Sequence, residues 1–251
     1  MDFSRFDTFV FDLDGTIWNW NELFPKVKIK INLLLQFGKQ RRWVSNNTLL
    51  SRFGLIRKMR GFGLEVGEKE VINAGFVIAQ YLKNKKGKVL VFGDGLKEDL
   101  RKEKIRLTNS SSADYLVVGQ DMKFNYEKLV LASECLKNGA KFLTAAKGRY
   151  FTLGNKLVPG TGMLVETIEN FTGKKAILLG KPSDYMLKTL KKFIDSPINK
   201  IVQFGDELIA DISFGKKAGW FTALVRTGVD KKPSKTIKPD AVIDSVADIK
   251  I

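Results

Sequence analysis

The stretch TFVFDLDGT, residues 8–16, places a short run of apolar and β-favouring residues directly before two acids. Residues 8–11 predict a buried strand, and the polar segment DLDGT predicts the loop that follows it. Asp12 and Asp14 leave this strand two residues apart, so both side chains can turn into one site. Because two acids at the end of a buried strand are costly unless they are used, this loop is a candidate functional site.

Three further apolar segments end in polar clusters of the same kind. They are RRWVSNN, AILLGKP and IVQFGDE, at residues 41–47, 176–182 and 201–207. Helical patterns lie between these segments, and strands that alternate with helices predict a doubly wound parallel sheet with helices on both faces. In such an α/β fold, ligands bind beyond the carboxyl ends of the strands, where all four polar clusters lie.

The middle of the chain repeats the α/β pattern on a smaller scale. After the linker-like KNKKGK, the segments KVLVFGDG, DYLVVG and KFLTA predict short strands, and YEKLVLASECLKNG predicts a helix between two of them. We therefore expect a larger α/β domain made of residues 1–86 and 174–251, with a smaller α/β domain, residues 87–173, inserted into it.

The chain is strongly basic. Lys and Arg number 43 against 27 Asp and Glu, which gives a net charge of +16, but the basic residues are spread along the chain. Such a charge fits a field that attracts anionic substrates. It also fits a nucleic-acid-binding module, although no nucleic-acid motif accompanies it. We therefore expect a phosphorylated small molecule rather than nucleic acid as the partner.

The sequence also excludes several classes of function. It has no histidine, which excludes His general bases and His metal ligands, and its single cysteine, Cys135, excludes an internal disulfide. No apolar stretch approaches the roughly 20 residues of a membrane span. The start MDFSRFDTFVF carries an acid and only one Arg before a short apolar run, whereas a secretory signal has a basic start and a longer apolar core. We therefore expect a cytoplasmic protein without a membrane partner.

The residue types in the four polar clusters suit phosphoryl transfer. A carboxylate can attack phosphorus and form an acyl-phosphate, and a second acid can protonate the leaving oxygen and later deprotonate water. A hydroxyl, a backbone amide and an ammonium can hold the phosphoryl oxygens. Further acids can hold Mg²⁺, a hard cation that prefers oxygen ligands.

The chain resembles the haloacid dehalogenase (HAD) superfamily of phosphatases over nearly its whole length. FDLDGT, VSNN, GKPS and FGDELIAD occur in the order of the four motifs of that family. The inserted segment resembles the α/β cap of the NagD-like and p-nitrophenylphosphatase branch, on the phrases KNGAKFLTA and LVPGTGMLVE, with RTGV beyond it. The resemblance implies Mg²⁺-dependent hydrolysis of small-molecule phosphate monoesters through an aspartyl-phosphate. It also implies a cap that closes over the substrate and often forms a homodimer.

The resemblance further implies roles for the residues of these motifs. Asp12 would be the nucleophile and Asp14 the general acid and base. Mg²⁺ would be held by Asp12, Asp206, Asp211 and the backbone carbonyl of Asp14. The phosphate ester would be bound by Ser45, Asn46 and Lys181, and Asn47 would also contact the substrate.

A second pair of acids has the spacing of the metal pair. VLVFGDGLKED places Asp94 and Asp99 five residues apart, as Asp206 and Asp211 are. Spacing alone cannot choose between the pairs, but the family's metal motif follows its Lys motif, which selects Asp206 and Asp211. We interpret Asp94 and Asp99 as turn and helix-start residues of the insertion.

The loop at residues 144–149, TAAKGR, departs from the NagD-like pattern, which commonly carries an Asn and an Asp there. If the family geometry holds, Lys147 and Arg149 would face the substrate beyond its phosphate and would favour esters with a second negative group. The alternative is that both side chains point into solvent.

Rival functions stay open from the sequence alone. A phosphotransferase or mutase would use the same fold, with another hydroxyl in place of water. A binding protein on this fold without catalytic activity would be expected to have lost Asp12 or Asp206, yet both are present. A nucleic-acid-binding module rests only on the net charge.

Overall fold

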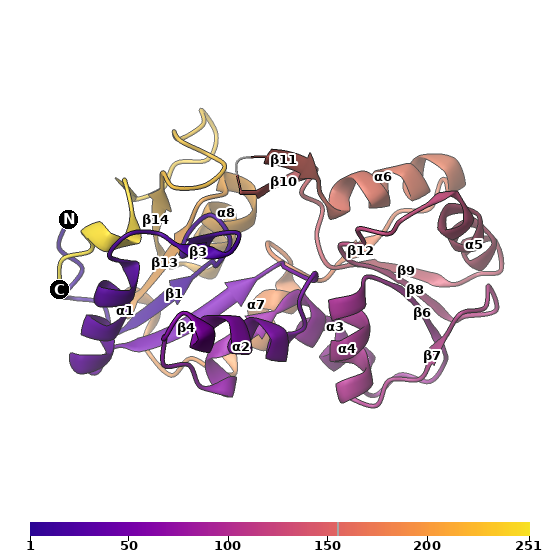
Figure 1. Cartoon of the computed structure of the whole chain (residues 1–251), viewed down its shortest axis with the longest axis horizontal. Coiled ribbons are helices and arrows are strands. Elements are labelled where there is room, and N and C mark those ends of the chain that lie inside the picture. The colour runs from indigo at the N-terminus through magenta and orange to yellow at the C-terminus, as the bar shows by residue number, and fades with distance from the viewer. Residues whose placement is uncertain (155) are drawn as a thin grey trace.

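Two parallel sheets lie side by side along the long axis of the molecule in the computed structural model, which describes residues 1–154 and 156–251 (Figure 1). The larger sheet has the order β15-β14-β13-β1-β4-β5, and every neighbouring pair in it is parallel. Its strands are β1 (Thr8–Phe11), β4 (Gln40–Ser45), β5 (Val71–Asn73), β13 (Ile201–Gly205), β14 (Phe221–Val225) and β15 (Ala241–Ile243). Because β1 is flanked by β13 and β4, the DLDGT loop leaves the middle of the carboxyl edge.

Helices cover both faces of this sheet. Successive side chains of a strand point to opposite sides, so the apolar residues of β1 contact helices on each face. Phe9 and Phe11 pack in one apolar cluster with α1 and α2, and Val10 packs in a second cluster with α3, α7 and α8. The helices are α1 (Val27–Gln36), α2 (Arg52–Gly61), α3 (Ala74–Leu82), α7 (Asp184–Lys191) and α8 (Ser213–Ala218). This arrangement confirms the predicted doubly wound α/β fold.

The smaller sheet is also parallel, with the order β12-β9-β8-β6-β7. Its strands are β6 (Val89–Phe92), β7 (Leu107–Thr108), β8 (Tyr115–Val118), β9 (Lys141–Thr144) and β12 (Ile177–Leu178), and its helices are α4 (Asp94–Lys102), α5 (Tyr126–Lys137) and α6 (Thr161–Thr172). The second apolar cluster of the larger sheet continues into this one through Val91 and Leu143. The two sheets are therefore joined by shared packing as well as by the chain.

Among the described residues, two small antiparallel hairpins and four short helical turns accompany the two sheets. The hairpins are β2 (Trp18–Asn19) with β3 (Glu22–Leu23), and β10 (Tyr150–Leu153) with β11 (Lys156–Pro159). The turns are Glu68–Glu70, Ile198–Lys200, Leu208–Ile212 and Val246–Asp248. The β2–β3 hairpin follows the DLDGT loop directly, so it lies beside the candidate site.

The strand predicted in AILLGKP differs from expectation in its partner. Ile177–Leu178 pairs with β9 at the edge of the smaller sheet, although residues from 174 onward were assigned to the larger domain. An apolar run this short carries no signal for which sheet it joins. The division of the chain at residues 86 and 173 stays a prediction.

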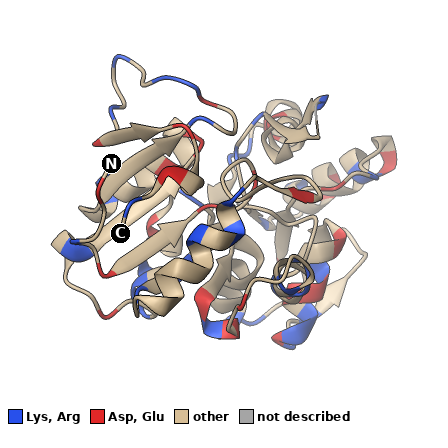
Figure 2. Ribbon diagram, turned by 60° about the vertical axis from the view of Figure 1, so that its left-hand side comes forward, with Lys and Arg blue, Asp and Glu red and all other residues tan. Residues whose placement is uncertain are grey.

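The charged residues are distributed over the whole molecule. Figure 2 shows Lys and Arg positions along both halves of the ribbon, interspersed with Asp and Glu rather than gathered on one face of this view. Within the described residues, no helix has both the length and the apolarity that a membrane crossing needs. Cys135 lies in α5, where the sequence predicted a helix, and is buried in the apolar cluster of the smaller sheet.

Candidate active site

The carboxyl edge of the larger sheet brings together polar residues from three neighbouring strands. Phe11 at the end of β1 is paired with Phe204 of β13 and with Trp43 of β4, so the three strands end close to one another. Asp12, Ser45 and Asp206 therefore lie at one edge, as the sequence predicted. Lys181 reaches the same place from the loop after β12.

Lys181 is the centre of the contacts at this edge. Its side chain is buried, and its Nζ lies 2.6 Å from Oδ1 of Asp12, 2.6 Å from Oδ1 of Asp211 and 2.8 Å from the carbonyl oxygen of Val44. These three acceptors match the three donors of an ammonium group. Burial alone would lower the pKa of Lys181, but the carboxylates of Asp12 and Asp211 raise it above its usual value. The residue is thus a fixed cation bridging two acids.

Asn46 fixes the backbone that carries this lysine. Its side-chain Oδ1 accepts from the backbone N–H of Lys181 at 2.7 Å, and its Nδ2 donates to the carbonyl of Lys181 at 3.0 Å. Gly180 is needed beside this clamp, because a Cβ there would lie 1.9 Å from the carbonyl oxygen of Ala145. The side chain of Asn46 is occupied in positioning Lys181, which leaves only its backbone amide for the predicted phosphoryl contact.

Three acids form a buried cluster around Lys181. Among the described residues, Asp12, Asp206 and Asp211 each offer an oxygen, and these oxygens lie within 4.8 Å of one another. Burial, and then the neighbouring carboxylates, raise the pKa values of Asp12 and Asp206 well above their ordinary range. Three acids share one ammonium, so all three can be ionised together only if a further cation compensates them, and oxygen ligands suit a hard divalent cation. The donor set therefore fits the predicted Mg²⁺.

Asp206 is enclosed by two loops that hold its carboxylate. Thr16 Oγ1 donates to Oδ1 at 3.3 Å and the backbone N–H of Val229 donates to Oδ2 at 2.7 Å. A Cβ at Gly15 would lie 2.4 Å from Oδ2, and one at Gly228 would lie 1.8 Å from it. Gly15 also has a φ of +80°, which favours glycine. These two glycines allow the loops to close on the acid.

The loop at residues 227–230 is a part of the site that sequence reasoning did not assign. Thr227 Oγ1 donates to the carbonyl of Gly15 at 2.6 Å, and Asp230 N donates to the carbonyl of Asp206 at 2.9 Å. Its signal in the sequence was the phrase RTGV, which supported the family resemblance but indicated no role. Through these hydrogen bonds, the loop holds both the DLDGT turn and Asp206 of the acid cluster in place.

The carboxylate of Asp14 is held by two side-chain donors. Asn47 Nδ2 donates to Oδ2 at 2.9 Å, and Trp18 Nε1 donates to Oδ1 at 2.8 Å. Ser45, buried beside them, accepts from the backbone N–H of Asn47 at 3.0 Å, which leaves its own hydroxyl proton free to donate. Asn47, predicted to contact substrate, contacts Asp14 here. The sequence did not indicate Trp18 as a site residue, because only the β2–β3 hairpin brings its side chain back to Asp14.

Lys147 and Arg149 are paired with glutamates of α6. Lys147 Nζ lies 2.9 Å from Oε1 of Glu169, and Arg149 Nε lies 3.3 Å from Oε2 of Glu166. No contact among the described residues joins either cation to the acid cluster. To bind a second anionic group of a substrate, each cation would have to give up its contact with a glutamate. This loss reduces the free energy gained on binding the anionic group. Their role in selecting anionic esters stays a prediction.

The second acid pair lies elsewhere and has another role. Asp94 is the first residue of α4, with a side chain that is 78% exposed. Asp99 lies inside α4 and is buried, so its interpretation as a helix-start residue is wrong. Its two oxygens accept from the backbone N–H of Arg52 and from Nδ2 of Asn73, both at 2.8 Å. Asp99 thus ties α4 to the N-termini of α2 and α3.

This buried acid should make stability depend on pH. Burial raises the pKa of Asp99 to about 6, so its stabilising effect is fully present below its unfolded value near 4 and is lost as pH rises through 6. Between pH 4 and pH 7 we expect the wild type to lose about 2 kcal/mol of unfolding free energy relative to Asp99→Asn, because Asp99 of the unfolded chain is already about half ionised at pH 4. Urea unfolding of both proteins at the two pH values measures this difference, in which the other groups cancel. A difference independent of pH would contradict the prediction.

Comparison with known proteins places the chain in a family. Residues 9–106 match the haloacid dehalogenase-like hydrolase family, and residues 178–249 match a HAD-hydrolase-like family. Phosphoglycolate phosphatase 2 of Arabidopsis thaliana is 30% identical to the chain over 281 residues, covering 98% of this chain and 93% of that protein. The chain belongs to the haloacid dehalogenase-like hydrolase family.

Solved structures identify the branch. The p-nitrophenyl phosphatase from Archaeoglobus fulgidus superimposes with a TM-score of 0.88 and 30% sequence identity, covering 97% of each chain. NagD from Escherichia coli K-12 has the same fold, with a TM-score of 0.85, 24% identity and 98% of each chain covered. The resemblance to NagD-like proteins and p-nitrophenylphosphatases is therefore confirmed.

Proposed function

We propose that this protein is a Mg²⁺-dependent phosphatase that hydrolyses small-molecule phosphate monoesters through an aspartyl-phosphate on Asp12. It is a phosphoric monoester hydrolase by its family and by relatives that are named phosphatases. The observation that carries the finer proposal is the buried cluster in which Lys181 bridges Asp12 and Asp211, with Asp206 beside them.

The first step would be an attack on phosphorus by Asp12. Oδ1 of Asp12 is bound to Lys181, and no donor among the described residues reaches Oδ2, which is free to act as the nucleophile. As the bond from Oδ2 to phosphorus forms, the bond from phosphorus to the ester oxygen breaks. Asp14 would give its proton to that oxygen, so that a neutral alcohol leaves.

The second step would return the enzyme to its starting state. Asp14 would take a proton from water, whose oxygen attacks phosphorus while the bond to Oδ2 of Asp12 breaks, which releases inorganic phosphate. The hydroxyl of Ser45 and the backbone amide of Asn46 would donate to the phosphoryl oxygens in both steps, and the ammonium of Lys181, which is bound to Asp12, would stabilise their negative charge. Bound Mg²⁺ would neutralise charge between the phosphoryl group and the acid cluster.

The substrate is proposed only as a class. One relative is named a phosphoglycolate phosphatase, and another, YutF of Bacillus subtilis, is named a 5′-nucleotidase and is 27% identical over 96% of this chain and 96% of its own. These names cover esters with very different alcohol groups. A release assay over a panel of esters, from nucleotides to phosphoglycolate, would identify the preferred alcohol.

Trapping the phosphoenzyme tests the proposal directly. Acid quench of the enzyme reacting with a ³²P-labelled ester and Mg²⁺ should leave label on the protein, and hydroxylamine should release it, because acyl-phosphates react with this nucleophile. The label should map to the peptide that contains Asp12. Hydrolysis without any trapped label, in a quench fast enough to precede turnover, would count against a covalent intermediate.

A further inference from the structure

Trp18 is positioned against the proposed acid and base of the reaction. It is fully buried and is the first residue of the β2–β3 hairpin, and its Nε1 lies 2.8 Å from Oδ1 of Asp14. Its backbone is fixed as well, because its carbonyl accepts from Gly15 N at 2.8 Å and its N–H donates to the carbonyl of Leu13 at 3.3 Å. The indole N–H is therefore aimed at Asp14 by the same loop that carries this acid.

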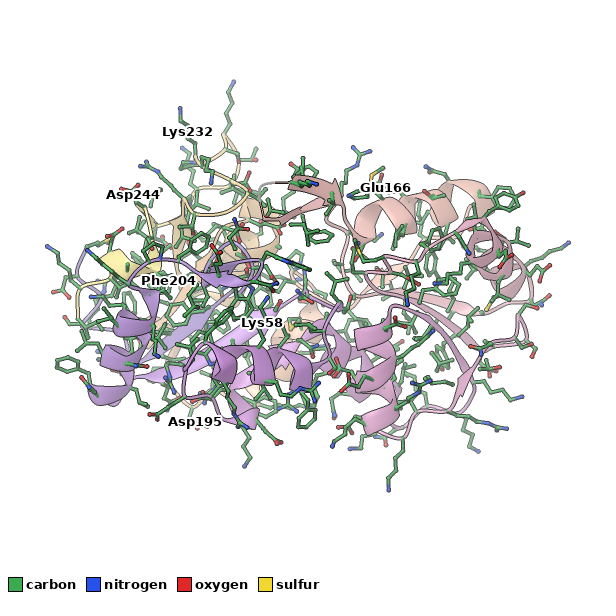
Figure 3. The ribbon with its side chains drawn as sticks, viewed as in Figure 1. Lys58, Glu166, Asp195, Phe204, Lys232 and Asp244 are labelled. Atoms are coloured by element: carbon green, nitrogen blue, oxygen red, sulfur yellow. The ribbon has the colours of Figure 1, made fainter. Side chains whose placement is uncertain are left out.

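Lys58 of α2 lies against the face of this indole. Its Nζ is 4.8 Å from the centre of the Trp18 ring and donates to the carbonyl oxygen of Trp20 in the same hairpin. Lys58 is labelled in Figure 3. Burial lowers the pKa of Lys58, and the charge of Asp14 opposes that shift, so the two side chains interact electrostatically. A cation over an indole face is attracted by the ring and draws electron density toward itself, which makes the N–H a better donor.

We propose that Trp18, backed by Lys58, is a positioning residue that orients the carboxylate of Asp14 for proton transfer. This inference rests on the proposed function. Trp18 donates to one carboxylate oxygen while Asn47 donates to the other, so rotation of the group would break a hydrogen bond. Each oxygen keeps a second lone pair. The carboxylate can thus stay anchored while it holds or accepts the transferred proton.

A positioning role predicts a dependence on the leaving group. Trp18→Phe keeps an aromatic ring but removes the N–H donor. An alkyl phosphate needs its leaving oxygen protonated, whereas p-nitrophenyl phosphate needs little protonation. We expect kcat/KM, which reports the step in which the leaving group departs, to fall about tenfold more for an alkyl ester than for p-nitrophenyl phosphate, the size expected for losing one hydrogen bond to a charged group. KM for either ester should change little, because Trp18 contacts Asp14 rather than substrate.

Trp220→Phe is the matched control. Trp220 is also buried, and within the described residues its Nε1 has no hydrogen-bond partner. The same substitution there removes the same atoms without touching Asp14. The ratio of alkyl to aryl activity should then equal that of the wild type.

Lys58 provides a second test that does not depend on folding of the Trp18 variant. Lys58→Met keeps the length of the side chain and removes its charge, and we expect a selective loss of roughly threefold on the alkyl ester. Lys58→Arg restores a cation over the ring and should restore the ratio. An unchanged ratio in Lys58→Met would overturn the part assigned to Lys58.

The outcomes separate this inference from the proposed function. Equal losses on alkyl and aryl esters in Trp18→Phe, or no loss on either, would show that Trp18 only supports the fold and would overturn the inference. In both cases the variant would still form the trapped phosphoenzyme. A wild type that forms no phosphoenzyme would instead refute the proposed function on which the inference rests.

Discussion

Asp12→Asn should abolish turnover while leaving the protein folded. An amide cannot attack phosphorus, and loss of a nucleophile costs on the order of 10⁴-fold or more in rate. The fold should tolerate the change because it removes one of three clustered acids whose mutual repulsion and burial raise the pKa values of Asp12 and Asp206. Lys181 keeps Asp211 as its partner, at 2.6 Å. Phosphate release and thermal unfolding of the purified variant measure the two expectations.

Asp94→Asn is the control for this substitution. Asp94 is exposed on α4, outside the acid cluster, so the same acid-to-amide change there should leave phosphate release as in the wild type. Excess Mg²⁺ should not rescue Asp12→Asn, because the missing group is the nucleophile. Near-normal phosphate release by Asp12→Asn would show that the aspartyl-phosphate mechanism is wrong.

The sequence predicted the larger sheet because its strands carry strong local signals. TFVF and IVQFG are apolar runs that end in polar loops, and both form buried strands of the expected type. The two-residue strand Ile177–Leu178 forms as the sequence predicts but pairs in the smaller sheet. Its partner, β9, is set by where the chain crosses between the sheets, and periodicity contains no information on such long-range pairing.

The acid cluster and its lysine were likewise predictable, because motif order distinguished Asp206 and Asp211 from a pair with the same spacing. What could not be predicted was the partner of each side chain. Asn47, predicted to contact the substrate, also donates to Asp14. Asp99 is buried because the N-termini of α2 and α3 converge on it. Both contacts join residues far apart in the chain, so local sequence cannot indicate them.

The strongest test of the metal site compares the wild type with Asp206→Asn. Chelation should stop hydrolysis by the wild type, and added Mg²⁺ should restore it. Loss of even a supporting residue around a metal typically costs about 10–100-fold in metal affinity, so loss of a proposed ligand should raise the Mg²⁺ concentration for half-maximal activity by about 100-fold or more. Asp94→Asn should respond to Mg²⁺ as the wild type does. A variant of Asp206 with an unaltered Mg²⁺ requirement would exclude it as a ligand.

Thermal unfolding should distinguish a lost ligand from a damaged fold, because the two predict opposite effects without metal. An amide at 206 can still accept from Val229 N, and the hydroxyl of Thr16 can turn to accept from its NH₂ group. With EDTA, the variant should therefore be at least as stable as the wild type, since it removes one member of a crowded cluster of buried acids. Binding of Mg²⁺ stabilises only a protein with the site intact, by about 2.7 kcal/mol at 100 times the dissociation constant. Mg²⁺ should thus reverse the order of the two Tm values, whereas an equal rise in both would place the ion elsewhere.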